Sequence, residues 1–145
     1  MKIDLKKLRN SGKTESSFCF EYSPEADLID IPSACLNLPV TVTGKVTLTD
    51  KHSALIEGEV CFTINGVCTR CVEETAKTFV ASFSQYVEEN NSDGYSVVND
   101  NVDLAKIVED EIILNVPTTF LCSDDCKGIC QGCGVNLNKD SCKCK

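Results

Sequence analysis

Eight of the 11 cysteines in this chain stand at spacings typical of metal ligands. Six of them fall between residues 122 and 145 in the pattern C-x3-C-x3-C-x2-C-x8-C-x-C, and a C-x-x-C pair lies about 50 residues upstream. Four thiolates are the usual complement of a structural zinc ion, so the set predicts one or two such ions. The candidate metal ligands are Cys68, Cys71, Cys122, Cys126, Cys130, Cys133, Cys142 and Cys144.

The spacing favours one division of these ligands into two sites. Cys130-Gln-Gly-Cys133-Gly134 is a metal-knuckle pattern, because a glycine after the second cysteine permits the tight turn that aims N–H groups at sulfur. The favoured division joins this pair to Cys142 and Cys144, and joins Cys68 and Cys71 to Cys122 and Cys126. Two alternatives stay open: a crossed division that joins the two C-x-x-C pairs, and a single zinc with spare thiols.

Cysteines also form disulfides, iron–sulfur clusters and redox switches, and each of these is an alternative to structural zinc. A disulfide framework is disfavoured because residues 1–13 are charged and lack the apolar segment of a secretory signal, so we expect a cytoplasmic protein in a reducing compartment. Cys126, Cys130 and Cys133 match the spacing of radical-SAM iron–sulfur enzymes, but those enzymes need a large barrel that this chain is too short to form. Two alternative functions stay open. One is a zinc–thiolate redox switch, in which oxidation ejects the metal and frees the tail, and the other is a protein-binding module unrelated to RNA.

Conventional catalysis finds little support. His52 is the only histidine and stands in a predicted turn, so no Cys–His or Ser–His–Asp set is evident. Sites filled by four cysteines leave no open coordination position for hydrolysis. Glu109, Asp110 and Glu111 would be spread over different faces of a helix, and no glycine loop suited to phosphate is present. We therefore predict a protein that is not an enzyme and has no small-molecule substrate.

The net charge of −8 is unevenly distributed along the chain. Residues 1–13 carry five basic groups against one acid, whereas residues 14–121 carry 5 basic and 18 acidic groups. An acidic body repels phosphate backbones, so only the basic N-terminal arm and the tail are expected to approach RNA directly. No apolar run approaches the roughly 18 residues of a membrane span.

Three alternating runs predict consecutive antiparallel strands. From Pro39, valines alternate with threonines; after a turn at residues 50–53 the chain returns through Ile56–Ile64, and a third run follows at Phe79–Val87. The Cys68–Cys71 pair would lie at the tip of the second hairpin. A further strand is expected at Ser17–Tyr22, and a short strand at Ile3–Leu5 followed by a polar loop. Residues 88–101 are expected to form a polar loop, and Cys19, Cys35 and Cys61 are expected to be small core residues.

One strong helix is predicted at about 103–115. Asp103 is a good N-cap, and Leu104, Ile107, Val108 and Ile112 form an apolar stripe at helical spacing. Glu111 falls within that stripe, where it either pairs with Arg70 or reaches solvent from the edge of the stripe. Glu109 and Asp110 point away from it, toward a solvated face.

These elements predict an α+β fold: a β-rich antiparallel sheet or partly open barrel with one main helix and a C-terminal cysteine-rich, zinc-binding tail. The β-rich domain would span 1–121, and the tail 122–145 would pack on the 68–71 hairpin tip. The tail has little apolar material, so we expect it to be unfolded without metal. Structural zinc contributes about 10–16 kcal/mol in small peptides, more than the typical 5–15 kcal/mol net stability of a domain.

The motifs taken together resemble a known family. CTRC at 68–71, DLAKIVEDEIILNVP at 103–117, and the tail LC-x3-CKGIC-x2-CG-x-NLN-x3-C-x-C are similar to the YceD family, whose bacterial members are named large ribosomal RNA subunit accumulation proteins. The resemblance implies a cytoplasmic factor that supports accumulation of large-subunit ribosomal RNA or ribosome assembly, with no established enzymatic activity. Its partner would be ribosomal RNA or a ribosome-assembly protein, reached through a protein partner or the basic N-terminal arm.

Overall fold

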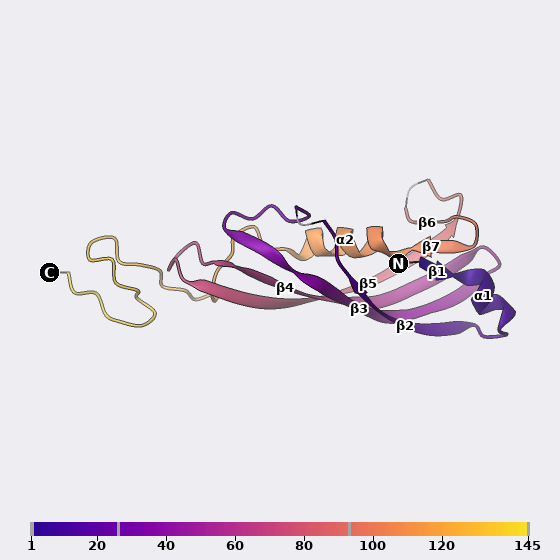
Figure 1. Ribbon diagram of the computed structural model, residues 1–145, viewed down its shortest axis with the longest axis horizontal. Helices are drawn as coiled ribbons and strands as arrows, with labels where there is room; N and C mark the ends of the chain where they lie inside the picture. Colours follow the sequence, from indigo (N-terminus) through magenta and orange to yellow (C-terminus); the bar gives the residue numbers. More distant parts are fainter. Residues whose placement is uncertain (1, 26, 93, 145) are drawn as a thin grey trace.

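The protein, described here by a computed structural model over residues 2–25, 27–92 and 94–144, is built on one open five-stranded sheet. The strands lie in the order β2 (Glu15–Tyr22), β3 (Ala34–Asp50), β4 (Ser53–Val67), β5 (Glu74–Glu89) and β6 (Ser96–Val97). All neighbours are antiparallel except the short β5–β6 pair. Figure 1 shows a long, twisted sheet with one helix along its face. The predicted antiparallel sheet is confirmed, and it stays open rather than forming a barrel.

The alternation in the sequence decides which face of the sheet is buried. Residues of one parity on β3, β4 and β5 point inward and are almost fully buried, among them Val42, Ile56, Val60, Ile64 and Val87. The helix α2 (Leu104–Asn115) covers this face with its predicted stripe, whose four members are 0% exposed. The Asp103 carboxylate caps the helix by accepting a hydrogen bond from the Ala105 N–H at 3.0 Å.

A row of paired residues crosses four strands at a point where the two middle strands have no room for side chains. Phe18 pairs with Gly44, Gly44 with Gly58, and Gly58 with Phe83. A Cβ placed on Gly44 would lie 2.7 Å from the Gly58 Cα and 2.8 Å from the Phe18 ring, so both strands need glycine for this approach. The two phenylalanine rings cover the gap that the glycines leave.

The N-terminal arm is folded onto the end of the sheet that lies opposite the C-terminal tail (Figure 1). The strand β1 (Lys2–Asp4) pairs antiparallel with β7 (Asn101–Asp103), just before α2. The expected polar loop after β1 is instead a helix, α1 (Leu5–Asn10), so that prediction is wrong. Asp4 caps α1 by accepting from the Lys7 N–H at 3.0 Å, and Leu5 and Leu8, three residues apart, are buried together.

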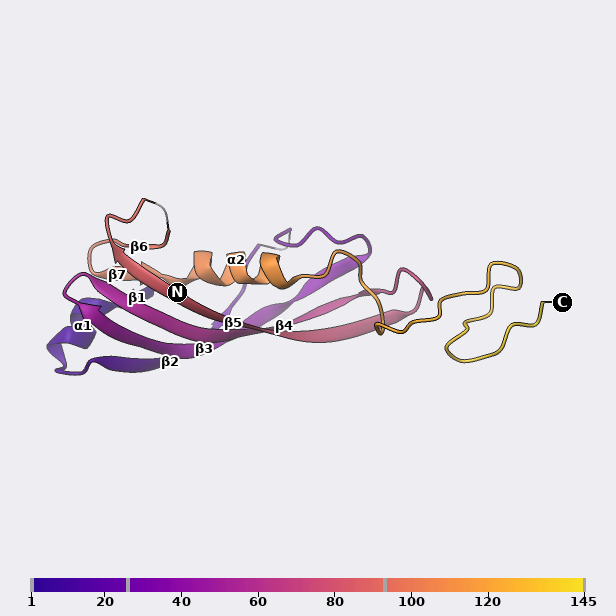
Figure 2. The same cartoon turned by 180° about the vertical axis from the view of Figure 1, so that it is seen from behind.

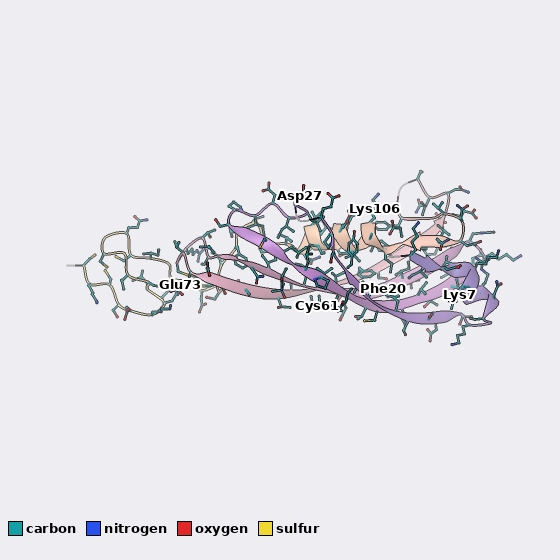
Figure 3. All side chains as sticks on the ribbon, in the orientation of Figure 1. Lys7, Phe20, Asp27, Cys61, Glu73 and Lys106 are labelled. Carbon is teal, nitrogen blue, oxygen red and sulfur yellow. The ribbon has the colours of Figure 1, made fainter. Side chains whose placement is uncertain are left out.

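Cys19, Cys35 and Cys61 are exposed, so their predicted place in the core is wrong. Cys61 lies between the inward-facing Val60 and Phe62, and strict alternation therefore turns it to the outer face. Figure 3 marks its position on the sheet. These three thiols lie apart from the eight candidate ligands.

The acidic side chains of α2, two of which were predicted to face solvent, accept hydrogen bonds from other parts of the chain. Glu109 accepts a hydrogen bond from the Tyr22 hydroxyl at 2.5 Å, and Asp110 accepts one from Tyr95 at 2.7 Å. The bond to Glu109, together with burial, raises the pKa of Tyr22 to about 12. Glu111 is 9% exposed and lies 3.4 Å from the Gln85 amide that donates to it.

The proposed Arg70–Glu111 pair is wrong, because the Arg70 guanidinium donates to the Cys126 carbonyl at 3.1 Å. The predicted loop at 88–101 contains the short strand β6 and the start of β7, and β5 continues to Glu89. None of the helices in the described residues is both long and apolar enough to cross a membrane.

Candidate metal centres

The eight candidate sulfurs gather in two groups of four. Within each group all the sulfur atoms lie within 4.8 Å of one another. The first group, here called the hairpin site, contains Cys68, Cys71, Cys122 and Cys126. The second, the tail site, contains Cys130, Cys133, Cys142 and Cys144. This is the grouping that the spacing favours, and it differs from the crossed alternative.

The hairpin site is built on the turn between β4 and β5. The Cys68 N–H donates to the Glu73 carbonyl and the Val72 N–H to the Cys68 carbonyl, both at 2.9 Å, which closes the turn. The returning chain is tied to it by a hydrogen bond from the Thr69 N–H to the Phe120 carbonyl at 3.0 Å. Residues after α2 are thereby delivered to the tip, where Cys122 and Cys126 meet the turn cysteines.

Sulfur separations in the hairpin site fit a tetrahedral ion. Sulfurs placed 2.3 Å from a central zinc would be about 3.8 Å apart. The Cys68–Cys126 sulfurs are 3.7 Å apart and the Cys71–Cys122 sulfurs 3.6 Å apart. Cys68, Cys71 and Cys126 are at most 4% exposed, so this group is shielded from solvent.

Four thiols this close cannot all ionise easily without a cation. Burial opposes ionisation of Cys68, but N–H groups of Cys71, Cys122 and Arg70 outweigh it and lower the pKa of Cys68 to about 6. Hydrogen bonding to Cys126, then burial, raises the pKa of Cys122 to about 12. The hydrogen bond from the Asn138 amide likewise lowers the pKa of Cys126, so two of the four thiolates form more readily than the other two. A divalent cation is what would stabilise all four together.

The tail site depends on two glycines in its first turn. Gly134 has a φ of +75°, and its N–H donates to the Cys130 carbonyl at 2.9 Å. A Cβ on Gly132 would lie 2.6 Å from the Cys144 sulfur, so glycine is required for that sulfur to approach. N–H groups of Cys133 and Gly132 lower the pKa of Cys130 to about 6.

The tail site is also the more open of the two. Its Cys130 sulfur lies 3.3 Å from that of Cys142 and 3.7 Å from that of Cys144, again near the edge length of a zinc–sulfur tetrahedron. Cys133, Cys142 and Cys144 are exposed. Figure 2 shows the tail leaving the sheet at the end opposite α1, with its turns surrounded mainly by solvent.

Two side chains that the sequence reasoning missed connect the sites. The Asn138 amide donates to the Cys126 sulfur at 3.3 Å, while its carbonyl oxygen accepts from the Lys127 N–H at 2.9 Å. Lys139 forms an ion pair with Glu73, which Figure 3 places beside the hairpin tip. The position of Asn138, midway between the Cys130–Cys133 and Cys142–Cys144 pairs, is the sequence feature that could have predicted a contact with a ligand.

The donor set decides what these sites can do. Thiolate groups of this number and spacing suit zinc, and the residues present fit it at both sites. Four protein ligands fill a tetrahedral ion, so a metal held here would supply cross-linking of the chain. The structure brings all eight predicted ligands together, and their binding of metal stays a prediction.

Comparison with known proteins adds the family. A family model described as "Large ribosomal RNA subunit accumulation protein YceD" matches residues 56–145, which include both candidate sites, β5 and α2. The chain belongs to the YceD family. The resemblance noted from the motifs is thus confirmed.

Two curated relatives carry the same family name. The "Large ribosomal RNA subunit accumulation protein YCED homolog 1, chloroplastic" of Arabidopsis thaliana is 26% identical over 153 residues, which covers 81% of this chain and 46% of that protein. The protein of the same name from Zea mays is 36% identical over 52 residues, covering 35% of this chain and 18% of that protein. The chain therefore spans less than half the length of either YceD relative. No solved structure matches it significantly.

Proposed function

We propose that this protein is a non-enzymatic factor that supports accumulation of large-subunit ribosomal RNA and carries two structural zinc ions. The family match supports the role, because the relatives are named for accumulation of that RNA. The observation that carries the zinc assignment is the gathering of eight sulfurs in two groups of four, at separations suited to tetrahedral zinc.

Zinc would give the tail a shape that its apolar residues cannot. The tail's larger apolar side chains, those of Ile129, Val135 and Leu137, are all partly exposed. A zinc ion in the hairpin site would fasten the tail to the β4–β5 turn, and a second would close the tail on itself. The metal would thus stabilise the fold of the tail, and the folded tail would provide the surface that binds the partner.

The acidic body directs the choice of partner. Residues 14–121 carry 18 acids against 5 bases, so the protein is poorly suited to wrap RNA. We propose that it acts through a ribosome-assembly protein or through RNA contact confined to the basic N-terminal arm. The cytoplasmic location expected from the sequence stays a prediction, since the named relatives are chloroplastic.

Elemental analysis and complementation together test this function. Purified protein is expected to hold two zinc ions per chain; one zinc would remove one site, and iron would reopen the redox alternative. Cells that lack the protein are expected to lose mature large-subunit ribosomal RNA, measured against the small-subunit RNA. Cys126→Ser should fail to restore it, whereas Cys61→Ser, which alters an exposed thiol outside both sites, should succeed.

One observation favours the redox switch as a second candidate. Three of the tail-site thiols are exposed, and N–H groups hold the pKa of Cys130 near 6, so an oxidant could reach a reactive sulfur. Zinc release by low micromolar peroxide, accompanied by altered partner binding, would support the switch. Zinc that stays bound under those conditions would remove it.

A further inference from the structure

A pocket of about 420 Å³ opens between the N-terminal arm and β2, at the opposite end of the molecule from the sulfurs. Its volume is within the roughly 300–1,000 Å³ of ordinary ligand pockets. The floor is apolar and includes Leu8, Phe18, Phe20 and Val46. Three exposed lysines, here called the rim lysines, also line the pocket: Lys2, Lys7 and Lys13. Figure 3 shows Lys7 on α1 and Phe20 on β2, both far from the tail.

The two phenylalanines form a stacked platform. Their ring centroids are 5.7 Å apart and their planes differ by 22°. The Phe18 ring is fixed over Gly44, as described above, whereas Phe20 extends the platform along β2. Both rings remain partly exposed, on the face of β2 that adjoins the buried core. A stack of two partly exposed rings can be extended by another planar ring.

The rim lysines are available to an anion. The ion pairs found in the described residues use Arg9, Lys45, His52 and Lys139 as their cations, so Lys2, Lys7 and Lys13 are outside them. Asp4 also lines the pocket, but its carboxylate accepts the Lys7 N–H as the cap of α1. The pocket is thus a local concentration of positive charge on a protein whose net charge is −8.

We propose that this pocket, here called the α1–β2 pocket, binds single-stranded RNA, with a nucleobase stacked on Phe18 and Phe20 and flanking phosphates paired with Lys2, Lys7 and Lys13. Stacking on aromatic rings beside basic groups is how single strands are generally held. The acidic body confines the contact to a few nucleotides, because longer duplex RNA would meet repulsion along the sheet. The inference rests on the proposed function. Of the two modes of action proposed there, a protein partner or direct RNA contact by the N-terminal arm, it selects the direct RNA contact.

Fluorescence anisotropy with a labelled single-stranded RNA of about ten nucleotides tests the pocket, using the full-length, zinc-loaded protein. Phe20→Ala is expected to weaken binding about tenfold or more, the usual loss for one stacked base. Phe20→Leu keeps apolar bulk at the site but removes the aromatic face, so it should weaken binding to a similar degree while leaving the melting temperature nearly unchanged.

The lysines are tested by salt dependence. Lys7→Gln and Lys13→Gln should each reduce the slope of log K against log salt by about 0.7, the value expected for one lost contact to a single-strand phosphate. Lys77→Gln on β5 makes the same charge change away from the pocket and should leave the slope unchanged. Tyr86→Ala is the matched aromatic control, since Tyr86 is 51% exposed on the outer face of β5.

Three results would overturn the α1–β2 pocket as an RNA site. These are the absence of RNA binding, binding that the Phe20 and lysine variants do not change, and equally tight binding of double-stranded RNA, which stacking cannot explain. If a Phe20→Leu protein without RNA affinity still restored ribosomal RNA in deficient cells, RNA binding in the pocket would not be needed for the proposed function, which would itself still stand. If deficient cells had normal ribosomal RNA, the function would fail whatever the pocket binds.

Discussion

Loss of the hairpin site should destabilise the sheet itself, and this prediction follows from where the site is attached. Cys68 and Cys71 belong to the turn that joins β4 to β5, and hydrogen bonds from Thr69 and Arg70 hold residues 120–126 against it. A metal bound there links the sheet to the chain that leaves α2. Unfolding of the sheet therefore has to release the metal, and the two events are thermodynamically linked.

The magnitude follows from that linkage. Free zinc held at about a thousand times the dissociation constant stabilises the folded state by about 4 kcal/mol. A domain of about 150 residues shifts its melting temperature by about 2–4 °C per kcal/mol. We therefore expect Cys71→Ser in buffered zinc to lower the melting temperature of the sheet by about 8–16 °C.

The assay is far-ultraviolet circular dichroism during heating, in zinc buffer and again after chelation. Cys61→Ser is the matched control, because it removes an exposed thiol from the middle of β4, the strand that leads into the turn of Cys71, and should melt with the wild type. Cys133→Ser disrupts the tail site alone and should leave the melting of the sheet within about 2 °C while exposing the tail to protease.

After chelation the wild type and Cys71→Ser should melt together. A Cys71→Ser deficit that persists unchanged in metal-free protein would show that the thiol contributes through packing alone. A wild-type melting temperature that chelation does not lower would refute the linkage between the hairpin site and the sheet.

Three further predictions concern the groups around the sites. Asn138→Ala removes the amide that donates to the Cys126 sulfur, so it should lower zinc affinity at the hairpin site about 10–100-fold. Competition with a chromogenic chelator measures that affinity. Unchanged affinity would show that Asn138 serves only to form the turn. Tyr22→Phe removes the hydroxyl bonded to Glu109 and should cost about 1 kcal/mol in urea unfolding, with Tyr86→Phe as a neutral control. N–H groups of the β4–β5 turn help to hold the pKa of Cys68 near 6, below the roughly 8.5 of an ordinary thiol. Cys68 therefore contributes stability above about pH 8.5 that is lost as the pH falls through 6. Metal-free protein should lose stability over that window, and a flat profile there would contradict the N–H···S assignment.

Much of the sheet and its helix could be predicted because their signals are local. Alternation from Pro39 onward fixed the buried parity of β3, and the Asp103 cap with its stripe placed α2 correctly. Ligand spacing favoured the grouping of the sulfurs that the structure shows. A short distance along the chain allows few geometries, so spacing favoured joining Cys130 and Cys133 to Cys142 and Cys144, although it left the crossed division open.

Two of the wrong predictions concern contacts that local patterns do not encode, whereas the one for Cys61 overlooked a local pattern. The helix α1 is only six residues long, and its stability depends on Asp4 and on burial of Leu5 and Leu8 against distant residues. Cys61 was assigned to the core by residue type, although its parity on β4 turns it to solvent. The partner of Arg70 is a backbone carbonyl, which has no signature in the sequence.

The most direct test of the account is zinc-edge X-ray absorption on the purified full-length protein, read together with the zinc content of the same sample. We predict two zinc ions per chain, each with four sulfur neighbours at about 2.3 Å and no nitrogen or oxygen neighbours. A sample without tightly bound metal whose residues 122–144 nevertheless resist protease would contradict the claim that metal–sulfur bonds give the tail its structure.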